Sequence, residues 1–168
     1  MARGNEILVS ANPKGFYEEC VISGTPKPGT VMELKKATAV IGGRWTFEPA
    51  GTTAAVGANL GMAADGDRLA IAVLLPDQLQ GKIATDAYAD GDRGFLYYPV
   101  SGEELNMLLE NQSGTADDFI IGSKLIVDDG TGKLLISAST VESEPFMCLE
   151  AITDMAADTL AWCKYTGH

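Results

Sequence analysis

Short stretches in which apolar and polar residues alternate, each closed by a turn, recur along this chain. Residues 31–35 (Val-Met-Glu-Leu-Lys) and 45–48 (Trp-Thr-Phe-Glu) alternate in this way, which is typical of strands with one buried face. Residues 69–75 form the longest apolar run and indicate a buried strand that ends at Pro76. Because several such strands follow at close intervals, we expect a mainly β fold: a small β-barrel or sandwich of short antiparallel strands, with at most short helices.

The clearest hairpin signal lies in the second half of the chain. Residues 116–127 and 133–136 are apolar stretches, and the sequence Asp128-Asp129-Gly130-Thr131-Gly132 joins them. Asp-Gly supplies the positive φ angle that a tight turn needs. These residues therefore predict a β-hairpin.

The segments on either side of this hairpin are also assigned to strands. Residues 103–110 fit a strand or a two-turn helix, and the hairpin-like spacing of the flanking turns favours the strand. Residues 146–152 and 160–165 form a final expected pair of strands. Between them, the acidic and Ala-rich residues 153–159 are expected to form one short helical turn.

The sequence Ala-Asp-Gly-Asp-Arg occurs twice, at residues 64–68 and 89–93, each time ahead of an apolar stretch. The repeat is short, and we interpret it as the same turn chemistry used twice, not as a duplicated domain.

The N-terminal residues differ in character from the rest. Residues 1–30 contain short apolar pieces broken by Pro and Gly, which predicts an extended N-terminal arm or, alternatively, an ordinary first hairpin strand with a long loop. Residues 31–168 are then expected to form a single β-rich domain. Within it, residues 49–64 are small and almost uncharged, and we interpret them as a long loop.

The net charge restricts the partners of the chain. It carries 23 acidic and 12 basic residues, a formal net charge of −11, and no run of Lys or Arg. Such a surface repels phosphate, so we expect no nucleic-acid partner and no binding to anionic membranes. The N-terminus lacks an apolar stretch of signal length, and residues 69–75 are too short to cross a bilayer, so we expect synthesis in a cytoplasm without an export signal.

The residue inventory argues against catalysis. His168, the last residue, is the only histidine, which weighs against Ser–His and Cys–His nucleophiles and against His-containing metal sites. The three cysteines, Cys20, Cys148 and Cys163, form no Cys-x-x-Cys pair, and we expect them to be buried free thiols. We therefore expect no enzyme, no catalytic, cofactor-binding or metal-binding residue, and no cofactor.

Two other groups of side chains have an alternative functional interpretation. Paired carboxylates can hydrolyse glycosides or hold Ca²⁺, but here each pair lies at a turn, so a turn role is favoured. The pairs are Asp65/Asp67, Asp90/Asp92, Asp117/Asp118 and Asp128/Asp129. Four aromatic residues can form a sugar-binding platform, although packing in a core or interface is favoured. They are Trp45, Tyr97, Tyr98 and Trp162.

The order of motifs from residue 86 to residue 151 resembles the head decoration, or capsid cement, proteins of tailed phages. In that family a "GD–apolar–P–x–x–G–E/D" hairpin precedes a "G–x–x–L–x–x–D–x–x–G–K–L" hairpin and a strand reading roughly "A–L–E–A". The corresponding segments here are DAYADGDRGFLYYPVSGEELNMLL, FIIGSKLIVDDGTGKL and, for the last strand, Cys148-Leu149-Glu150-Ala151. The resemblance covers the C-terminal half well, while the N-terminal half matches only in general character.

The resemblance implies a β-rich structural protein, often a homotrimer, that binds the outer surface of a phage capsid and cements neighbouring subunits of the major capsid protein. The expected location is the virion, after synthesis in the host cytoplasm. Residues 1–30 would be the arm that reaches onto neighbouring subunits. An acidic protein suits the outside of a DNA-filled shell. Two alternatives remain: a carbohydrate- or ligand-binding β module, and another virion component such as a tail or head-completion protein.

Overall fold

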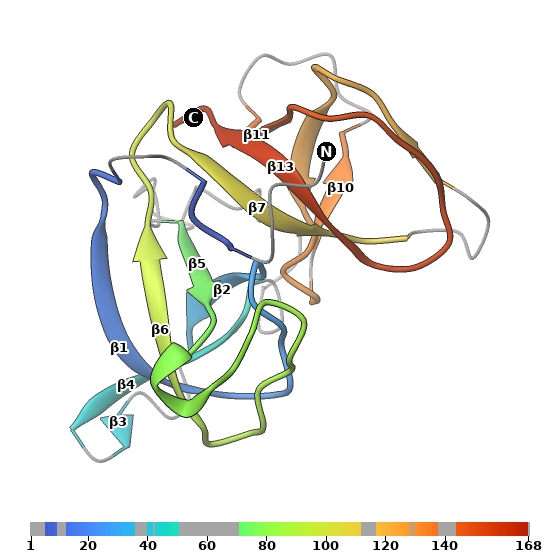
Figure 1. The fold of residues 1–168 in the computed structure, drawn as a ribbon. Coiled ribbons are helices and arrows are strands. Elements are labelled where there is room, and N and C mark those ends of the chain that lie inside the picture. Colours follow the sequence, from blue (N-terminus) through green and yellow to red (C-terminus); the bar gives the residue numbers. More distant parts are fainter. Residues whose placement is uncertain are drawn as a thin grey trace.

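The computed structural model describes residues 6–9, 13–35, 40–41, 43–50, 71–111, 117–128, 130–137 and 144–167. Within these residues the chain forms two lobes of short strands that pack against each other (Figure 1). The mainly β fold that the sequence predicts is confirmed, with closed sheets of five strands.

The first lobe is a ring of five strands. They are β1 (Phe16–Ile22), β2 (Val31–Leu34), β4 (Arg44–Pro49), β5 (Ala72–Leu75) and β6 (Arg93–Tyr98). Their order is β1-β6-β5-β2-β4, all antiparallel, and β4 closes the ring by pairing in parallel with β1 at Val21 and Ile22. A short strand, β3 (Val40–Ile41), extends β4 as a hairpin.

The second lobe is a closed barrel of five strands in the order β10-β7-β13-β11-β9. They are β7 (Glu104–Leu109), β9 (Lys124–Val127), β10 (Leu134–Ile136), β11 (Phe146–Cys148) and β13 (Thr159–Tyr165). A separate ribbon of two strands, β8 (Asp117–Phe119) and β12 (Ile152–Met155), lies outside this barrel sheet.

The two barrels have the same topology. In each, the first strand pairs antiparallel with the fifth and parallel with the third; the second strand pairs antiparallel with the third and fourth; and the fourth pairs antiparallel with the fifth. The chain thus contains one five-strand barrel twice, with β1, β2, β4, β5 and β6 equivalent to β7, β9, β10, β11 and β13.

The registers agree as well. The directly opposed residues Leu74 and Leu96 of the first barrel correspond to Cys148 and Cys163 of the second. The pair Leu34–Phe47 corresponds in the same way to Val127–Leu134. The duplication is therefore structural, although the repeated Ala-Asp-Gly-Asp-Arg sequence does not mark it.

The cores explain why the barrels pack together. One cluster of buried side chains lies inside the first barrel and includes Cys20, Ile22, Leu74 and Leu96. The other fills the second barrel and continues onto the outer face of the first; it includes Leu105, Leu125, Phe146, Val73 and Tyr97. Burial of apolar area across both barrels stabilises the junction.

Most strand predictions are confirmed. Residues 104–109 form a strand, as the flanking turns favoured, and not a helix. The hairpin after residue 116 is present as β9 and β10, and the C-terminal pair is present as β11 and β13. The expected helical turn at residues 153–159 is wrong. Residues 152–155 form β12 instead, because Met155 is buried in the core and this segment pairs with β8.

The expected N-terminal arm is folded where the structure describes it. Phe16–Ile22 is the first strand of the first barrel and pairs with β6 at six positions, from Phe16↔Tyr98 to Val21↔Arg93. Cys20 and Ile22 are buried inside that barrel, so apolar burial holds this segment within the sheet. The single domain expected for residues 31–168 accordingly contains all of one barrel and part of the other.

Two further predictions fall on residues that the structure does not describe. Of the expected loop at residues 49–64, only Pro49 and Ala50 are described, and the turn at residues 64–68 lies outside the described residues, as does His168. Within the described part of the chain, no helix has the length and apolar character needed to cross a bilayer.

Candidate functional site

A groove lies where the first strand of the first barrel meets the second barrel. Its volume is about 420 Å³, and its lining is mainly apolar. The side chains that form its walls include Ile7, Leu8, Tyr17, Leu75, Leu79 and Phe95. Tyr17 is 55% exposed and Leu79 is 82% exposed. Apolar side chains gathered at a rim in this way are typical of a protein–protein contact surface.

The backbone of β1 has an open edge beside this groove. Ile22 N–H donates to Asp92 O, and Gly91 N–H donates to Ile22 O, so the even-numbered residues of β1 bond to β6. The N–H and C=O groups of Tyr17 and Glu19 therefore face the opposite edge. β4 pairs with that edge only at Val21 and Ile22. Among the described residues, no strand pairs with β1 at Tyr17 or Glu19, although Arg44 of β4 contacts the Glu19 side chain.

The equivalent edge of the second barrel is covered. Asn106 N–H donates to Ile7 O at 2.7 Å, and Val9 N–H donates to Glu104 O at 3.1 Å, so residues 7–9 lie antiparallel to β7. Tyr17 and Glu19 of β1 correspond to Glu104 and Asn106 of β7. The duplicated barrel therefore contains an example of an extended segment bound at this position, whereas none of the described residues is bound at the equivalent position of β1.

A buried carboxylate shapes the loop that presents Leu79. Asp77 is fully buried, caps the 3₁₀ helix η1 (Gln78–Gln80), and accepts hydrogen bonds from Leu79 N–H at 3.0 Å and Gln80 N–H at 3.2 Å. The Arg93 guanidinium donates to the same carboxylate at 3.2 Å. These contacts fix the loop backbone, so that Leu79 points outward without a contact of its own to hold it.

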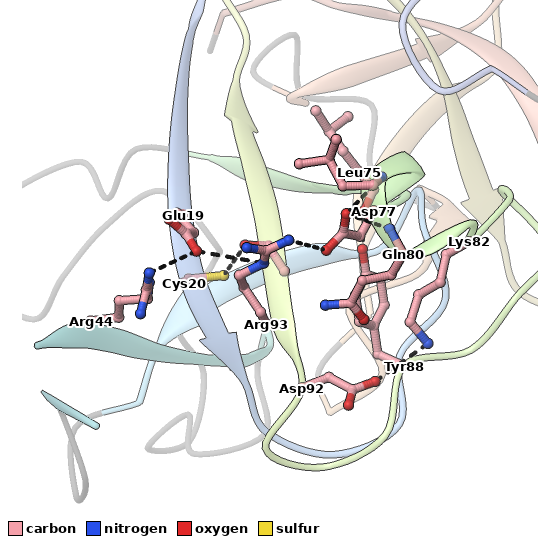
Figure 2. Close-up of polar contacts among 12 residues, drawn as sticks. Glu19, Cys20, Arg44, Leu75, Asp77, Gln80, Lys82, Tyr88, Asp92 and Arg93 are labelled. Carbon is pink, nitrogen blue, oxygen red and sulfur yellow. Dashed lines mark hydrogen bonds and ion pairs between the residues drawn. The ribbon is translucent and has the colours of Figure 1, made fainter. Parts of the chain in front are cut away.

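Figure 2 shows a row of alternating charges across three strands, which runs from Arg44 of β4 through Glu19 of β1 and Arg93 of β6 to Asp77. The nitrogen–oxygen distances along the row are 3.0, 3.5 and 3.2 Å. Arg44 and Arg93 are partly exposed, while Asp77 is not. The row therefore places two cations beside the open edge of β1, where an acidic residue of a partner can approach them.

The loop between η1 and β6 is also held from within. The Tyr88 hydroxyl donates to Leu75 O at 2.7 Å, and burial raises the pKa of Tyr88 well above its ordinary value. The Lys82 ammonium lies 3.3 Å from an Asp92 carboxylate oxygen and above the Tyr88 ring. Figure 2 shows the hydrogen bond from Tyr88 to Leu75 and the ion pair between Lys82 and Asp92. These contacts hold the loop against the end of β5, where Leu75 lines the groove.

Glu103 ties the start of β1 to the connection between the barrels. Its buried carboxylate accepts hydrogen bonds from Lys14 N–H, from the Tyr97 hydroxyl at 2.7 Å and from Val100 N–H at 2.9 Å. Burial acts to raise the pKa of Glu103, but these donors outweigh it and hold the pKa below its ordinary value. The Tyr97 hydroxyl in turn accepts a hydrogen bond from Gly15 N–H at 2.8 Å.

Four of the carboxylates that the sequence singled out accept hydrogen bonds from backbone N–H or hydroxyl groups, two of them within the same turn and two from distant residues. Asp90 accepts a hydrogen bond from Gly24 N–H, and Asp92 accepts one from Ala89 N–H, which is the main reason that the pKa of Asp92 is lowered. Asp128 accepts from the Thr131 hydroxyl, and Asp118 accepts from Asp154 N–H. Asp65, Asp67 and Asp129 lie outside the described residues. Within the described ranges, no three His, Cys, Asp or Glu side chains are grouped to hold a metal ion.

The aromatic residues considered as a sugar platform do not come together. Tyr97 is fully buried, and Trp162 of the second barrel donates its indole N–H to Glu104, whereas Trp45 is half exposed on β4 of the first barrel. Sequence reasoning missed Phe16 and Tyr17, because it assigned them to an arm. The apolar–acidic sequence Phe-Tyr-Glu-Glu at residues 16–19 was the only available signal of an edge strand.

The cysteines are buried free thiols, as the sequence predicts. Neither a protein-family model nor a curated protein sequence matches this chain.

Proposed function

We propose that this protein is a non-enzymatic structural protein that binds another protein at the open edge of β1 and the adjoining groove. The observation that carries the proposal is the contrast between the two barrels. Residues 7–9 cover the edge of β7, whereas the equivalent edge of β1 is unpaired among the described residues and lies beside the exposed Tyr17 and Leu79. An extended segment of a partner would gain backbone hydrogen bonds at this edge and apolar contacts in the groove.

We propose further that the partner is the major capsid protein of a tailed phage, and that a homotrimer of this chain decorates the outer capsid surface and cements neighbouring subunits. Three features support this: the resemblance of residues 86–151 to capsid cement proteins, the mainly β fold, and the net charge of −11, which suits a surface facing away from packaged DNA. Three binding surfaces on one trimer would add many modest contacts through multivalency.

Reconstitution on capsid shells tests this function. The full chain is mixed with expanded, DNA-free shells of the major capsid protein encoded in the same genome, and the shells are sedimented. We expect the chain to sediment with the shells and to behave as a trimer in analytical ultracentrifugation. A monomer that stays in the supernatant, or a genome without a major capsid gene, would contradict the proposal.

Surface variants locate the contact. Tyr17→Ser and Leu79→Ser remove apolar side chains at the groove and are expected to weaken sedimentation with the shells at least tenfold, since each deletes an exposed anchor. Ile121→Ser, which removes a 68% exposed side chain from the turn ahead of β9 in the second barrel, is the matched control and should bind normally. Equal binding by all three variants would exclude the groove as the contact. If the chain is instead a different virion component, it will be found on particles away from the capsid lattice.

A further inference from the structure

Two cysteines face each other inside the second barrel. Cys148 is the last residue of β11, and Cys163 lies directly opposite it on β13. Both side chains are fully buried; the Cys148 thiol donates to Glu150 O at 3.0 Å, and the Cys163 thiol is close enough to influence the pKa of Cys148. The third cysteine, Cys20, lies inside the other barrel, and its thiol donates to Gly94 O at 3.6 Å.

The backbone pairing at this position suits a cross-strand disulfide. Leu149 N–H donates to Trp162 O, and Cys148 N–H points the other way and donates to Ser123 O, both at 2.8 Å. Cys148 and Cys163 are therefore a non-hydrogen-bonded pair of the antiparallel ladder. In such pairs the Cα atoms lie about 4.5 Å apart, which is within the range of about 4.4–6.8 Å that disulfides span.

The duplicated barrel shows that packing alone does not require thiols here. At the equivalent position of the first barrel, Leu74 of β5 faces Leu96 of β6, and both side chains are buried. Two apolar side chains thus fill this site in the same topology. The paired thiols of the second barrel can form a disulfide, whereas Leu74 and Leu96 at the equivalent position of the first barrel cannot.

We propose that Cys148 and Cys163 are a site of oxidative cross-linking, at which a peroxide converts the two thiols into a disulfide that joins β11 to β13. In the first step the Cys148 sulfur attacks one oxygen of hydrogen peroxide, the O–O bond breaks, and the departing hydroxide takes up the thiol proton as water. In the second step the Cys163 sulfur attacks the resulting sulfenic sulfur and expels hydroxide, which takes the Cys163 proton as a second water. Together the two thiols lose two electrons, and these electrons reduce one peroxide to two waters.

The environments of the two thiols differ in a way that sets their order of reaction. The hydrogen bond from Cys163, opposed by burial, lowers the pKa of Cys148 to about 7, so that part of Cys148 is thiolate at neutral pH. Burial raises the pKa of Cys163 well above its ordinary value. Cys148 is thus the attacking sulfur and Cys163 the resolving one.

Peptide mapping of the full chain after oxidation tests this inference. The protein is treated with hydrogen peroxide at neutral pH, the remaining thiols are alkylated in denaturant, and the peptides are analysed by mass spectrometry without reduction. We expect a linked peptide pair containing Cys148 and Cys163, and alkylated Cys20. Oxidised protein should unfold at a higher urea concentration than reduced protein, and dithiothreitol should reverse the difference.

Three variants serve as controls. Cys20→Ala should retain the link, while Cys148→Ala and Cys163→Ala should each leave the other thiol without its partner. Full alkylation of all three cysteines after treatment, oxidation of Cys148 to sulfinic acid without a link, or links formed only between chains would overturn the inference. The mapping of the unaltered protein decides the question even if a variant does not fold.

Discussion

Gly29 and Gly122 are equivalent residues of the two barrels. Each has a left-handed backbone, with φ of 86° and 90°, and each lies two residues ahead of the second strand of its barrel. Gly29 N–H donates to Leu74 O, and Gly122 N–H donates to Cys148 O, which are equivalent acceptors. Thr30 N–H and Ser123 N–H close the two turns onto Lys27 O and Ile120 O. The duplication therefore extends from strand order to individual hydrogen bonds.

The surroundings of Gly29 and Gly122 differ. We therefore expect substitution at the two positions to lower the free energy of unfolding by different amounts. A Cβ atom at Gly29 would lie 2.8 Å from Leu160 Cδ2 and 3.0 Å from Leu108 N, whereas a Cβ atom at Gly122 would meet nothing within 4 Å. Gly122→Ala should lower the free energy of unfolding by about 1 kcal/mol, through backbone strain alone. Gly29→Ala should lower it by about 3 kcal/mol, because a clash between the barrels adds to that strain. Urea unfolding measures both, and equal losses would contradict the packing of this turn.

Asp77 should be the most sensitive polar residue beside the groove. Asp77→Ala removes the acceptor of two backbone N–H groups and of the partly exposed Arg93 guanidinium, and we expect a loss of about 2 kcal/mol in the free energy of unfolding. Asp77→Asn keeps an oxygen acceptor for the backbone N–H groups and should lose about half as much. Chemical denaturation of both variants checks this order. An Asn variant as unstable as the Ala variant would show that the ion pair with Arg93, and not the cap, is the main contribution.

Because the pKa of Glu103 is lowered in the folded protein, we expect the free energy of unfolding to depend on pH. Its pKa is lower in the folded protein than in the unfolded chain, so its contribution is fully present above about pH 4.5 and is lost as the pH falls through the folded-state pKa. Glu103→Gln removes this titration and also weakens the hydrogen bonds from Lys14 and Val100, at a cost of about 2 kcal/mol at neutral pH. The difference in free energy of unfolding between the two proteins should therefore shrink between pH 5 and pH 3. A constant difference over that range would contradict the assignment.

Proline substitutions test the open edge of β1. Glu18→Pro removes an N–H that faces β6 and should cost about 3 kcal/mol or more. Glu19→Pro removes an N–H that faces the uncovered edge and should cost about 1 kcal/mol, close to the value for Glu19→Ala, which controls for the lost ion pairs. Thermal unfolding compares the three variants. Equal destabilisation by both prolines would mean that the edge at Glu19 is already occupied.

Much of the secondary structure was predictable from local sequence. The Asp-Gly turns and the alternating stretches around residues 31–35, 45–48 and 133–136 predict strands because turn residues and period-2 burial are encoded within a few neighbouring positions. Residues 152–155 were not predictable in this way. Their acidic, Ala-containing surroundings favour a helical turn, and only the burial of Met155 and the pairing with β8 make them a strand.

Little in the sequence indicated the candidate site. Its groove is formed by residues from Ile7 to Phe95, and the open edge of β1 depends on where β4 ends its pairing. The capping contacts of Asp77 with Leu79 and Gln80 are local, but its contact with Arg93, sixteen positions further along the chain, has no local signature. Contacts of this kind depend on how the barrels close, which composition and spacing do not specify.

By itself, the sequence determined the mainly β character, the positions of most turns, the buried state of the cysteines and the acidity of the surface, because each depends on residue type and near neighbours. Only the tertiary structure decided that residues 16–22 belong to a barrel, that the barrel occurs twice, and that Cys148 faces Cys163. These features depend on pairing between strands that are distant along the chain. Such pairing is selected by the burial of whole faces, so the sequence of any one strand does not reveal its partner.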